Sequence, residues 1–181
     1  MHNARGLRHY LRRGGVIAYA TESCFGLGCD PRNRLGVQRI LRLKGRPQHK
    51  GLILIATHLQ QLQLYIGKLN ADQQTQMLLQ RSRPHTWLAP IGDACPKWLS
   101  GKHRSIAVRI TDFPPTRNLC KNADIALVST SANRSGQRPA KTYAQCQRLF
   151  GHKVWVLPGR VGKRKQPSTI SRWADGKIIR S

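Results

Sequence analysis

Acidic side chains are scarce in this sequence. Its 181 residues include 32 Lys and Arg but only seven Asp and Glu, which gives a formal net charge of +25. Such a surplus exceeds what solubility requires, and it predicts affinity for polyanions that weakens as salt is added. The cations are spread through every segment, which favours nucleic-acid contact without implying sequence-specific reading. A basic bias shared by all proteins of the source is the alternative that one sequence leaves open.

Long apolar runs and paired cysteines are also missing. No run approaches the roughly 18 residues that span a bilayer, and the basic segment 1–15 lacks the apolar stretch of a signal peptide. The five cysteines are odd in number and include no CxxC pair, which favours reduced, mostly structural thiols in a cytoplasmic protein. The seven histidines are dispersed and none pairs with Cys at zinc spacing, so no protein-held metal is expected.

The familiar catalytic loops are not found either. The sequence has no GxxxxGK[ST], no strand-linked GxGxxG and no nucleophile elbow, and it shows no acid–base dyad. Any chemistry would therefore depend on positioning and on neutralisation of charge. The hydrophobic fraction of 39% and the chain length are sufficient for one domain with a real core, which we place at 1–181.

Short buried strands alternate with helical segments along the chain. Strands are expected at 16–20, 52–56, 86–90, 105–110, 125–130, 154–158, 168–173 and 177–180. Helices are expected from Asp30-Pro31 to Gly45, after Thr57, at 70–80, after Pro114-Pro115, and at 142–150. The segment TESCFGLGCD is interpreted as a turn-rich loop and Asp175-Gly176 as a hairpin turn. This pattern predicts an α/β fold with flanking helices around a twisted, mixed parallel and antiparallel sheet.

Two polar loops border buried strands. In KGRPQHKGLILIA, Lys44 and Arg46 precede the strand at 52–56, and in VSTSANRSG the strand at 125–130 opens into Ser131 and Asn133. Cations, hydroxyls and an amide at strand ends are suited to holding phosphate oxygens. Taken singly, each loop also fits a bland interpretation, a solvated edge for the first and an ordinary Ser/Asn turn for the second.

Three further features add to this pattern. Glu22 is the only glutamate in the chain. Ser105 and Arg109 lie four residues apart on one expected strand and therefore on one face, where a buried arginine needs an anionic partner. Ser168, in PSTI, supplies another hydroxyl after a basic loop. Glu22 could equally serve as a cap or in a salt bridge.

The order of these motifs resembles the YrdC/TsaC family of threonylcarbamoyl-AMP synthases in its short, single-domain form. The resemblance runs from residue 20 to 170 and is carried by ATESCFGLGCD, KGRPQHKGLILIA, RPHTWLAP, SIAVRI, VSTSANRSG, LPG and PSTI. It implies a deep, positively charged cavity in which L-threonine, bicarbonate and ATP form threonylcarbamoyl-adenylate and pyrophosphate. Partner proteins would then transfer the threonylcarbamoyl group to tRNAs that read ANN codons.

The resemblance also implies roles for individual residues. Lys44 and Arg46 would project into the cavity and act in catalysis. The expected ATP ligands are Lys44, Arg46, Ser105, Arg109, Ser131 and Asn133. Thr21, Ser129 and Ser168 would contact threonine. Mg²⁺ would arrive with ATP rather than on protein ligands.

The sequence departs from the family pattern at three places. Ala20 replaces a proline before Thr21, Arg83 replaces a glycine before Pro84, and the loop 160–166 is unusually basic. Two alternatives to the synthase stay open at this point. One is a non-catalytic module that binds structured RNA, which would tolerate Ser131→Ala. The other is a related carbamoyl-adenylate activity, against which the Thr21 and PSTI hydroxyls argue.

Overall fold

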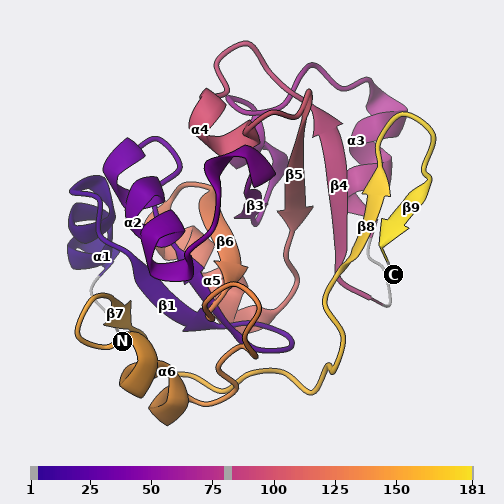
Figure 1. Cartoon of the computed structure of the whole chain (residues 1–181). Coiled ribbons are helices and arrows are strands. Elements are labelled where there is room, and N and C mark those ends of the chain that lie inside the picture. The colour runs from indigo at the N-terminus through magenta and orange to yellow at the C-terminus, as the bar shows by residue number, and fades with distance from the viewer. Residues whose placement is uncertain (1–3, 80–82, 181) are drawn as a thin grey trace.

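One mixed sheet organises the computed structural model, which describes residues 4–79 and 83–180 (Figure 1). Its nine strands in this part of the chain are β1 (Ile17–Ala20), β2 (Phe25–Gly28), β3 (Ile53–Ala56), β4 (His85–Pro90), β5 (Ser105–Ile110), β6 (Leu127–Ser131), β7 (Trp155–Val156), β8 (Thr169–Arg172) and β9 (Ile178–Arg180). Their spatial order is β7-β1-β2-β6-β3-β5-β4-β8-β9. The pairs β1–β7, β3–β5 and β4–β8 are parallel and the others antiparallel, so the predicted mixed sheet is confirmed.

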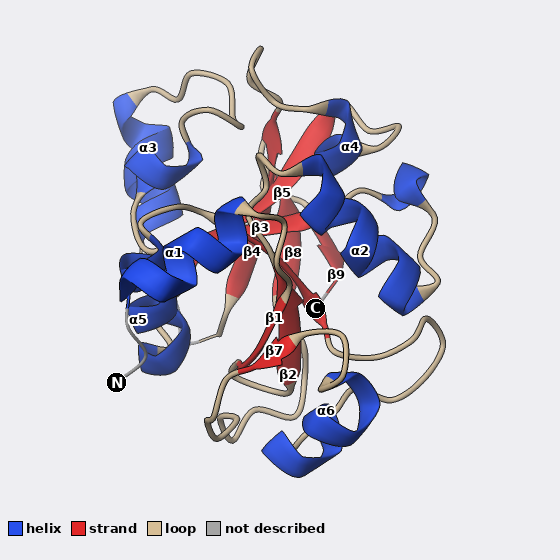
Figure 2. Ribbon diagram, turned by 90° about the vertical axis from the view of Figure 1, so that its left-hand side faces the viewer, coloured by secondary structure: helices blue, strands red, loops and turns tan. Residues whose placement is uncertain are grey.

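Helices cover both faces of this sheet. They are α1 (Ala4–Arg12), α2 (Arg34–Lys44), α3 (Ala71–Leu78), α4 (Lys97–Ser100), α5 (Pro114–Ala123) and α6 (Tyr143–Phe150), with 3₁₀ turns η1 (Gln48–Lys50) and η2 (Leu59–Leu62). Figure 2 shows α1 and α5 on one side of the strands and α2 on the other. Along β1, Ile17 and Tyr19 pack with α1 and α5, whereas Ala18 packs in the cluster that includes α2. This alternation is what a strand buried on both faces requires.

The segment TESCFGLGCD was expected to be a loop, and this was wrong. Its Phe25–Gly28 portion is strand β2, which pairs antiparallel with β1 and is fully buried. Glycine here provides space rather than a turn: a Cβ at Gly28 would lie 2.7 Å from the Val128 carbonyl oxygen and 2.9 Å from the Tyr19 ring. The glycines that suggest a turn therefore allow close approach within a sheet.

Helix boundaries also differ from expectation in places. Helix α2 begins at Arg34, because the Asn33 side chain accepts a hydrogen bond from the Gly36 amide (3.1 Å), while Asp30 bonds to Arg32 instead. The helix expected after Thr57 is only the 3₁₀ turn η2. Helix α1 was not expected. Only Leu7 and Leu11 of its residues are buried, and the helix packs against α5. We attribute its stability to this tertiary contact, because a short helix is marginal by itself.

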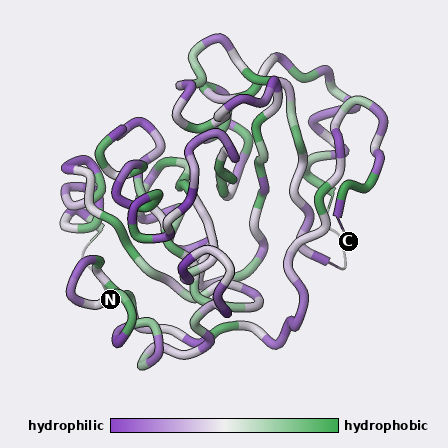
Figure 3. Tube along the Cα trace, in the orientation of Figure 1, coloured by the Kyte–Doolittle hydropathy of each residue, from purple (hydrophilic) through white to green (hydrophobic). Residues whose placement is uncertain are grey.

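Other expectations are confirmed. The helix expected at 70–80 is α3, and α2 ends at Gly45, whose φ is 58°, as expected. The structure adds that α3 begins with a capping box between Asn70 and Gln73. The hairpin of β8 and β9 turns at Gly176, whose φ is 68°. Figure 3 shows hydrophilic stretches around the outside of the fold, as the charge surplus requires. Among the described residues, no helix combines the length and apolar character needed to cross a membrane.

Candidate active site

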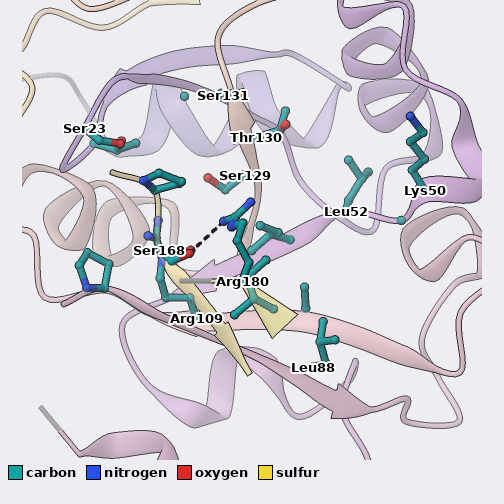
Figure 4. Close-up of a pocket in the computed structure, with 18 of the residues that line it drawn as sticks. Ser23, Lys50, Leu52, Leu88, Arg109, Ser129, Thr130, Ser131, Ser168 and Arg180 are labelled. Atoms are coloured by element: carbon teal, nitrogen blue, oxygen red, sulfur yellow. Dashed lines mark hydrogen bonds between the residues drawn. The ribbon is translucent and has the colours of Figure 1, made fainter. Parts of the chain in front are cut away.

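A cavity of about 420 Å³ opens over the middle of the sheet (Figure 4). Residues from β2, β3, β4, β5, β6 and β9 line it, together with the loop between β1 and β2 and the loop after α2. The residues used below that line it are Thr21, Glu22, Arg46, Lys50, Ser105, Arg109, Ser129, Ser131, Gln166, Ser168 and Arg180. Segments far apart in sequence thus meet at one place.

Positive charge predominates in this lining. Arg46, Lys50, Arg109 and Arg180 line the cavity, and Glu22 is the one carboxylate among the lining residues. Arg109 Nη1 lies 3.6 Å from Glu22 Oε1, and both side chains are about one-tenth exposed. One carboxylate cannot neutralise four cations, so the cavity is suited to a polyanionic ligand.

Arg46 lines the cavity and keeps one buried donor without a partner. One terminal nitrogen, Nη2, donates to the carbonyl oxygens of Lys50 (3.2 Å) and Gly51 (2.9 Å). Its Nε is buried and has no hydrogen-bond partner among the described residues. Burial lowers the pKa of Arg46. A buried donor without a partner favours an anionic ligand that would accept from it.

Lys44 does not line the cavity, contrary to expectation. Its side chain is buried, and Nζ donates to the carbonyl oxygens of Ser131 (2.6 Å) and Asn133 (2.9 Å) and lies 3.2 Å from Asn133 Oδ1. An ammonium group has three donors, and these three acceptors use all of them. Burial, and then the nearby charge of Arg46, lower the pKa of Lys44 to about 8.

The Ser131–Asn133 loop is held by its own polar groups as well as by Lys44. Ser131 Oγ donates to Asn133 Oδ1, and Asn133 Nδ2 donates to the carbonyl oxygens of Arg134 and Gln137, both at 2.8 Å. Ser131 lines the cavity, but Asn133 is not among the lining residues. Lys44 and Asn133 therefore form the support behind Ser131 in this structure.

The three expected threonine-contacting hydroxyls all line the cavity. Thr21 Oγ1 donates to the Cys24 carbonyl oxygen (2.8 Å), and the Ser168 and Thr86 hydroxyls lie 2.8 Å apart. Ser129 Oγ accepts from the Tyr19 hydroxyl at 2.7 Å. Burial raises the pKa of Tyr19, so this phenol stays a donor and leaves the Ser129 proton for another acceptor.

Arg180 is one of two lining cations that the sequence analysis did not predict as site residues, and Lys50 is the other. Arg180 lies on β9, and its Nη2 donates to the Ser168 carbonyl oxygen at 3.0 Å, the dashed line in Figure 4. Burial, and then the charge of Arg109, lower the pKa of Arg180. The available sequence signal for a site residue here was an arginine that directly follows the apolar pair at 178–179. Ser105 and Arg109 were expected on one strand face, and both line the cavity from β5.

The basic loop 160–166 pairs through its backbone with Thr21 and Glu22, which line the cavity. The Gly162 amide donates to the Thr21 carbonyl oxygen (2.9 Å), and the Arg164 amide donates to that of Glu22 (3.1 Å). A Cβ at Gly162 would lie 2.7 Å from the Glu22 carbonyl oxygen, so only glycine fits without a shift. The loop continues into Gln166 and Ser168, which line the cavity.

The chain has relatives along nearly its whole length. The Sua5/YciO/YrdC family model, described as "Telomere recombination", matches residues 9–181. The chain belongs to the Sua5/YciO/YrdC family. Its relatives include a protein of Methylobacillus flagellatus named threonylcarbamoyl-AMP synthase, 55% identical over 177 residues that cover 98% of each chain. A protein of the same name from Thiobacillus denitrificans is 51% identical and covers 97% of this chain and 94% of its own.

Solved structures of the Sua5/YciO/YrdC family share the fold. The crystal structure of P. abyssi Sua5 complexed with L-threonine matches 93% of this chain with a TM-score of 0.82 and 24% sequence identity. The present chain covers 50% of that Sua5 chain. At this identity the likeness concerns the fold alone.

Two departures from the family pattern are placed by the structure. Ala20 ends β1 and is buried, and its carbonyl oxygen accepts from Thr116 Oγ1 (3.1 Å). Arg83 is exposed and lines a smaller pocket of about 240 Å³ that shares Glu22 with the main cavity. Neither replaces a residue expected to bind a ligand. Within residues 4–79 and 83–180, no group of three or more His, Cys, Asp or Glu could hold a metal ion.

Proposed function

We propose that this chain is a cytoplasmic threonylcarbamoyl-AMP synthase that uses L-threonine, bicarbonate and ATP, and that its product serves the threonylcarbamoyl modification of tRNA. The carrying observation is the cavity, whose lining combines four Lys or Arg residues and one carboxylate with serine and threonine residues that include Thr21, Ser105, Ser129, Ser131 and Ser168. The names of two relatives at 55% and 51% identity support it.

The cations meet the electrostatic demand of this reaction. The threonine amine first takes up bicarbonate carbon as a carbamate, with loss of water. A carbamate oxygen then attacks the α-phosphorus of ATP, and the bond to pyrophosphate breaks. Both reactants are anionic, so neutralisation and alignment provide the catalysis, and an ionised carbamate needs no general base for this step.

Individual residues take the roles that their positions allow. Arg46 and Arg109, with the ATP ligand Ser131, would bind the phosphates, and Ser105 would contact the nucleotide from the Arg109 strand. Arg180 adds a cation that the sequence analysis did not foresee. Lys44 would act in catalysis chiefly by fixing Asn133 and the Ser131 loop, since direct contact with a phosphate would require Nζ to release one acceptor.

The threonine would bind beside Thr21, Ser129 and Ser168, whose hydroxyls line one cavity. The P. abyssi Sua5 structure complexed with L-threonine supports a threonine site in this fold. The Glu22 carboxylate faces Arg109, so the lining has no carboxylate set for Mg²⁺, which would enter bound to ATP oxygens. Transferase proteins would accept the adenylate and transfer its threonylcarbamoyl group to tRNA, with release of AMP.

Pyrophosphate release by the purified protein tests the function directly. We expect release only when ATP, bicarbonate and L-threonine are all present, with a fall to background when any one is omitted. Release without threonine would contradict the synthase, because pyrophosphate would then leave without a threonine carbamate to displace it. No release in the complete mixture would overturn the proposal.

Ser131→Ala separates an enzyme from a module that only binds RNA. The variant loses the hydroxyl of a lining residue, which also donates to Asn133 Oδ1, so we expect kcat/KM for pyrophosphate release to fall roughly 10²-fold. Binding of a tRNA transcript, measured by filter retention, should stay unchanged. A Ser135→Ala variant, in the same loop but outside the cavity lining, serves as control. Unchanged turnover in Ser131→Ala would remove Ser131 from the ATP site.

Gly162→Ala tests whether the basic loop positions Ser168. The added methyl group would press against the Glu22 backbone and shift the loop, so we expect the KM for threonine to rise roughly tenfold. Gly6→Ala is the matched control, because a Cβ at Gly6 meets nothing within 4 Å. Equal threonine KM values in the two variants would show that the loop does not position the threonine site.

A further inference from the structure

Strand β2 contains two glycines that have no part in the proposed chemistry. They are Gly26 and Gly28 of the segment FGLG, and both are buried. Neither has a positive φ, so the backbone conformation alone does not require glycine at these positions. The reason for glycine must therefore be what lies against the strand.

The ring of Tyr19 lies against both glycines. Tyr19, on β1, is the register partner of Gly26 on β2. A Cβ at Gly26 would lie 3.3 Å from Tyr19 Cζ, and a Cβ at Gly28 would lie 2.9 Å from Tyr19 Cε1. A larger residue at Gly28 would therefore displace the ring. The two glycines leave room for an aromatic side chain to cross β2.

This room allows Tyr19 to contact a strand that is not adjacent to its own. The local order of strands is β1-β2-β6, so β1 and β6 are roughly 9–10 Å apart, two inter-strand spacings. The Tyr19 hydroxyl nevertheless donates to Ser129 Oγ on β6 at 2.7 Å. Ser129 lines the cavity and is labelled in Figure 4, whereas Tyr19 is buried and is not among the lining residues.

The hydrogen bond from Tyr19 limits what the Ser129 hydroxyl can do. A serine hydroxyl has one proton and two lone pairs, and the Tyr19 proton occupies one lone pair. Burial raises the pKa of Tyr19, so the phenol keeps that proton. Within residues 4–79 and 83–180, Tyr19 is the one hydrogen-bond partner of Ser129 Oγ. The Ser129 proton is therefore left for an acceptor in the cavity.

The same hydrogen bond fixes the orientation of the Ser129 side chain. The pairing of Ser129 with Ile53 in the sheet holds its backbone in place. Rotation about χ1 is then the main freedom left to the side chain, and three staggered positions are open to a serine. A partner that is itself packed against Gly26 and Gly28 selects one of them.

We propose that Tyr19 is a positioning residue of the threonine site, which holds Ser129 as a hydrogen-bond donor toward an oxygen of the bound amino acid. The inference depends on the proposed function, because it deepens the role given to Ser129 there. A carboxylate or hydroxyl oxygen of threonine would accept the Ser129 proton, whereas an ammonium group would leave it unpaired. Tyr19 would act only through Ser129.

A second tyrosine shows what a purely structural phenol looks like in this fold. The Tyr10 hydroxyl donates to the Val16 carbonyl oxygen at 3.1 Å, and neither residue lines the cavity. Both tyrosines thus satisfy a largely enclosed hydroxyl, as such groups require. Only the partner of Tyr19 lines the cavity. Tyr10→Phe is therefore the matched control for Tyr19→Phe.

Tyr19→Phe in the full-length chain keeps the ring over the glycines and removes the hydroxyl. We expect the Kd for L-threonine, measured by isothermal titration calorimetry, and the KM for threonine in pyrophosphate release to rise roughly 3–10-fold, the range of one neutral hydrogen bond. The kcat and the KM for ATP should change less than about twofold, because only ground-state binding of threonine is weakened. Tyr10→Phe should leave both threonine constants unchanged, although thermal denaturation should show a comparable loss of stability.

A double-mutant cycle tests whether the effect of Tyr19 passes through Ser129. Ser129→Ala should raise the Kd for threonine at least as much as Tyr19→Phe does. The double variant Tyr19→Phe/Ser129→Ala should then match Ser129→Ala alone, because no hydroxyl is left to position. Effects that multiply in the double variant would show that Tyr19 acts by another route, and they would overturn the inference.

The remaining outcomes are also decisive. Native threonine affinity in Tyr19→Phe, or an equal rise of Kd in Tyr10→Phe, would overturn the positioning role. A rise in the KM for ATP as large as that for threonine would assign Tyr19 to the shape of the whole cavity, which also overturns it. Failure of the proposed function differs from these results: the native protein would bind threonine in a Tyr19-dependent way and release no pyrophosphate. Absence of threonine binding by the native protein would overturn the inference.

Discussion

Lys44→Met should lower kcat/KM for pyrophosphate release by roughly 10²–10³-fold. The substitution keeps most of the buried volume but leaves the Ser131 and Asn133 carbonyl oxygens without their donor. Unpaired buried acceptors should also lower the free energy of unfolding by about 1–3 kcal/mol, measurable by urea denaturation. Lys68→Met, at an exposed position, is the control. Native turnover in Lys44→Met would remove Lys44 from the catalytic machinery.

The pH dependence of the native protein provides a second measurement of the same residue. The pKa of Lys44 is lowered to about 8, so its positive charge is present below this pH and is lost as the pH rises through it. We expect kcat/KM to fall above about pH 8, because this parameter reports the free enzyme. In Lys44→Arg the fall should move to higher pH, whatever the absolute rate. A profile that is the same in both proteins would exclude Lys44 as its origin.

Arg109→Met should affect both stability and turnover. The substitution leaves the Glu22 carboxylate, about one-tenth exposed, without its cation, which should cost roughly 2–4 kcal/mol of unfolding free energy. It also removes a proposed phosphate ligand, so kcat/KM should fall roughly 10²-fold. Thermal denaturation and pyrophosphate release measure the two effects separately.

A double variant distinguishes these two contributions of Arg109. Glu22→Gln/Arg109→Met removes the stranded charge, so most of the lost stability should return while turnover stays low. Arg172→Met is the matched control, because its ion pair with Asp175 is about half exposed and should contribute little. Recovery of turnover in the double variant would show that Arg109 acts only by neutralising Glu22, and not by binding phosphate.

Sequence reasoning worked best where one local rule decided the outcome. The glycine that ends α2 and the hairpin turn at Gly176 each depend on a few neighbouring residues. It failed at β2, where glycines serve close packing against Tyr19 and Val128, residues that are distant in the chain. It also missed α1, whose stability comes from contact with α5.

In the candidate site, too, local motifs could be recognised from the sequence, whereas contacts between distant segments could not. The ordered motifs indicated Thr21, Arg46, Arg109, Ser131 and their neighbours as the chemically important residues, and the structure brings these four to one cavity. They did not indicate Arg180, which lies at the end of β9, a strand that only the sheet order brings to that cavity. The roles of these residues toward ATP and threonine stay predictions.

The sequence by itself determined the charge surplus, the mixed α/β class and the motifs that identify the family, because composition and local patterns do not depend on long-range contacts. Only the tertiary structure decided which cations share a surface. It brings Arg46, Arg109 and Arg180 to the cavity, encloses Lys44 behind the Ser131 loop, and gathers Arg39, Arg42, Arg134 and Lys153 along one groove between α2 and the end of α6. Charge acts through space, and residues distant in the chain become neighbours only when the sheet and helices pack.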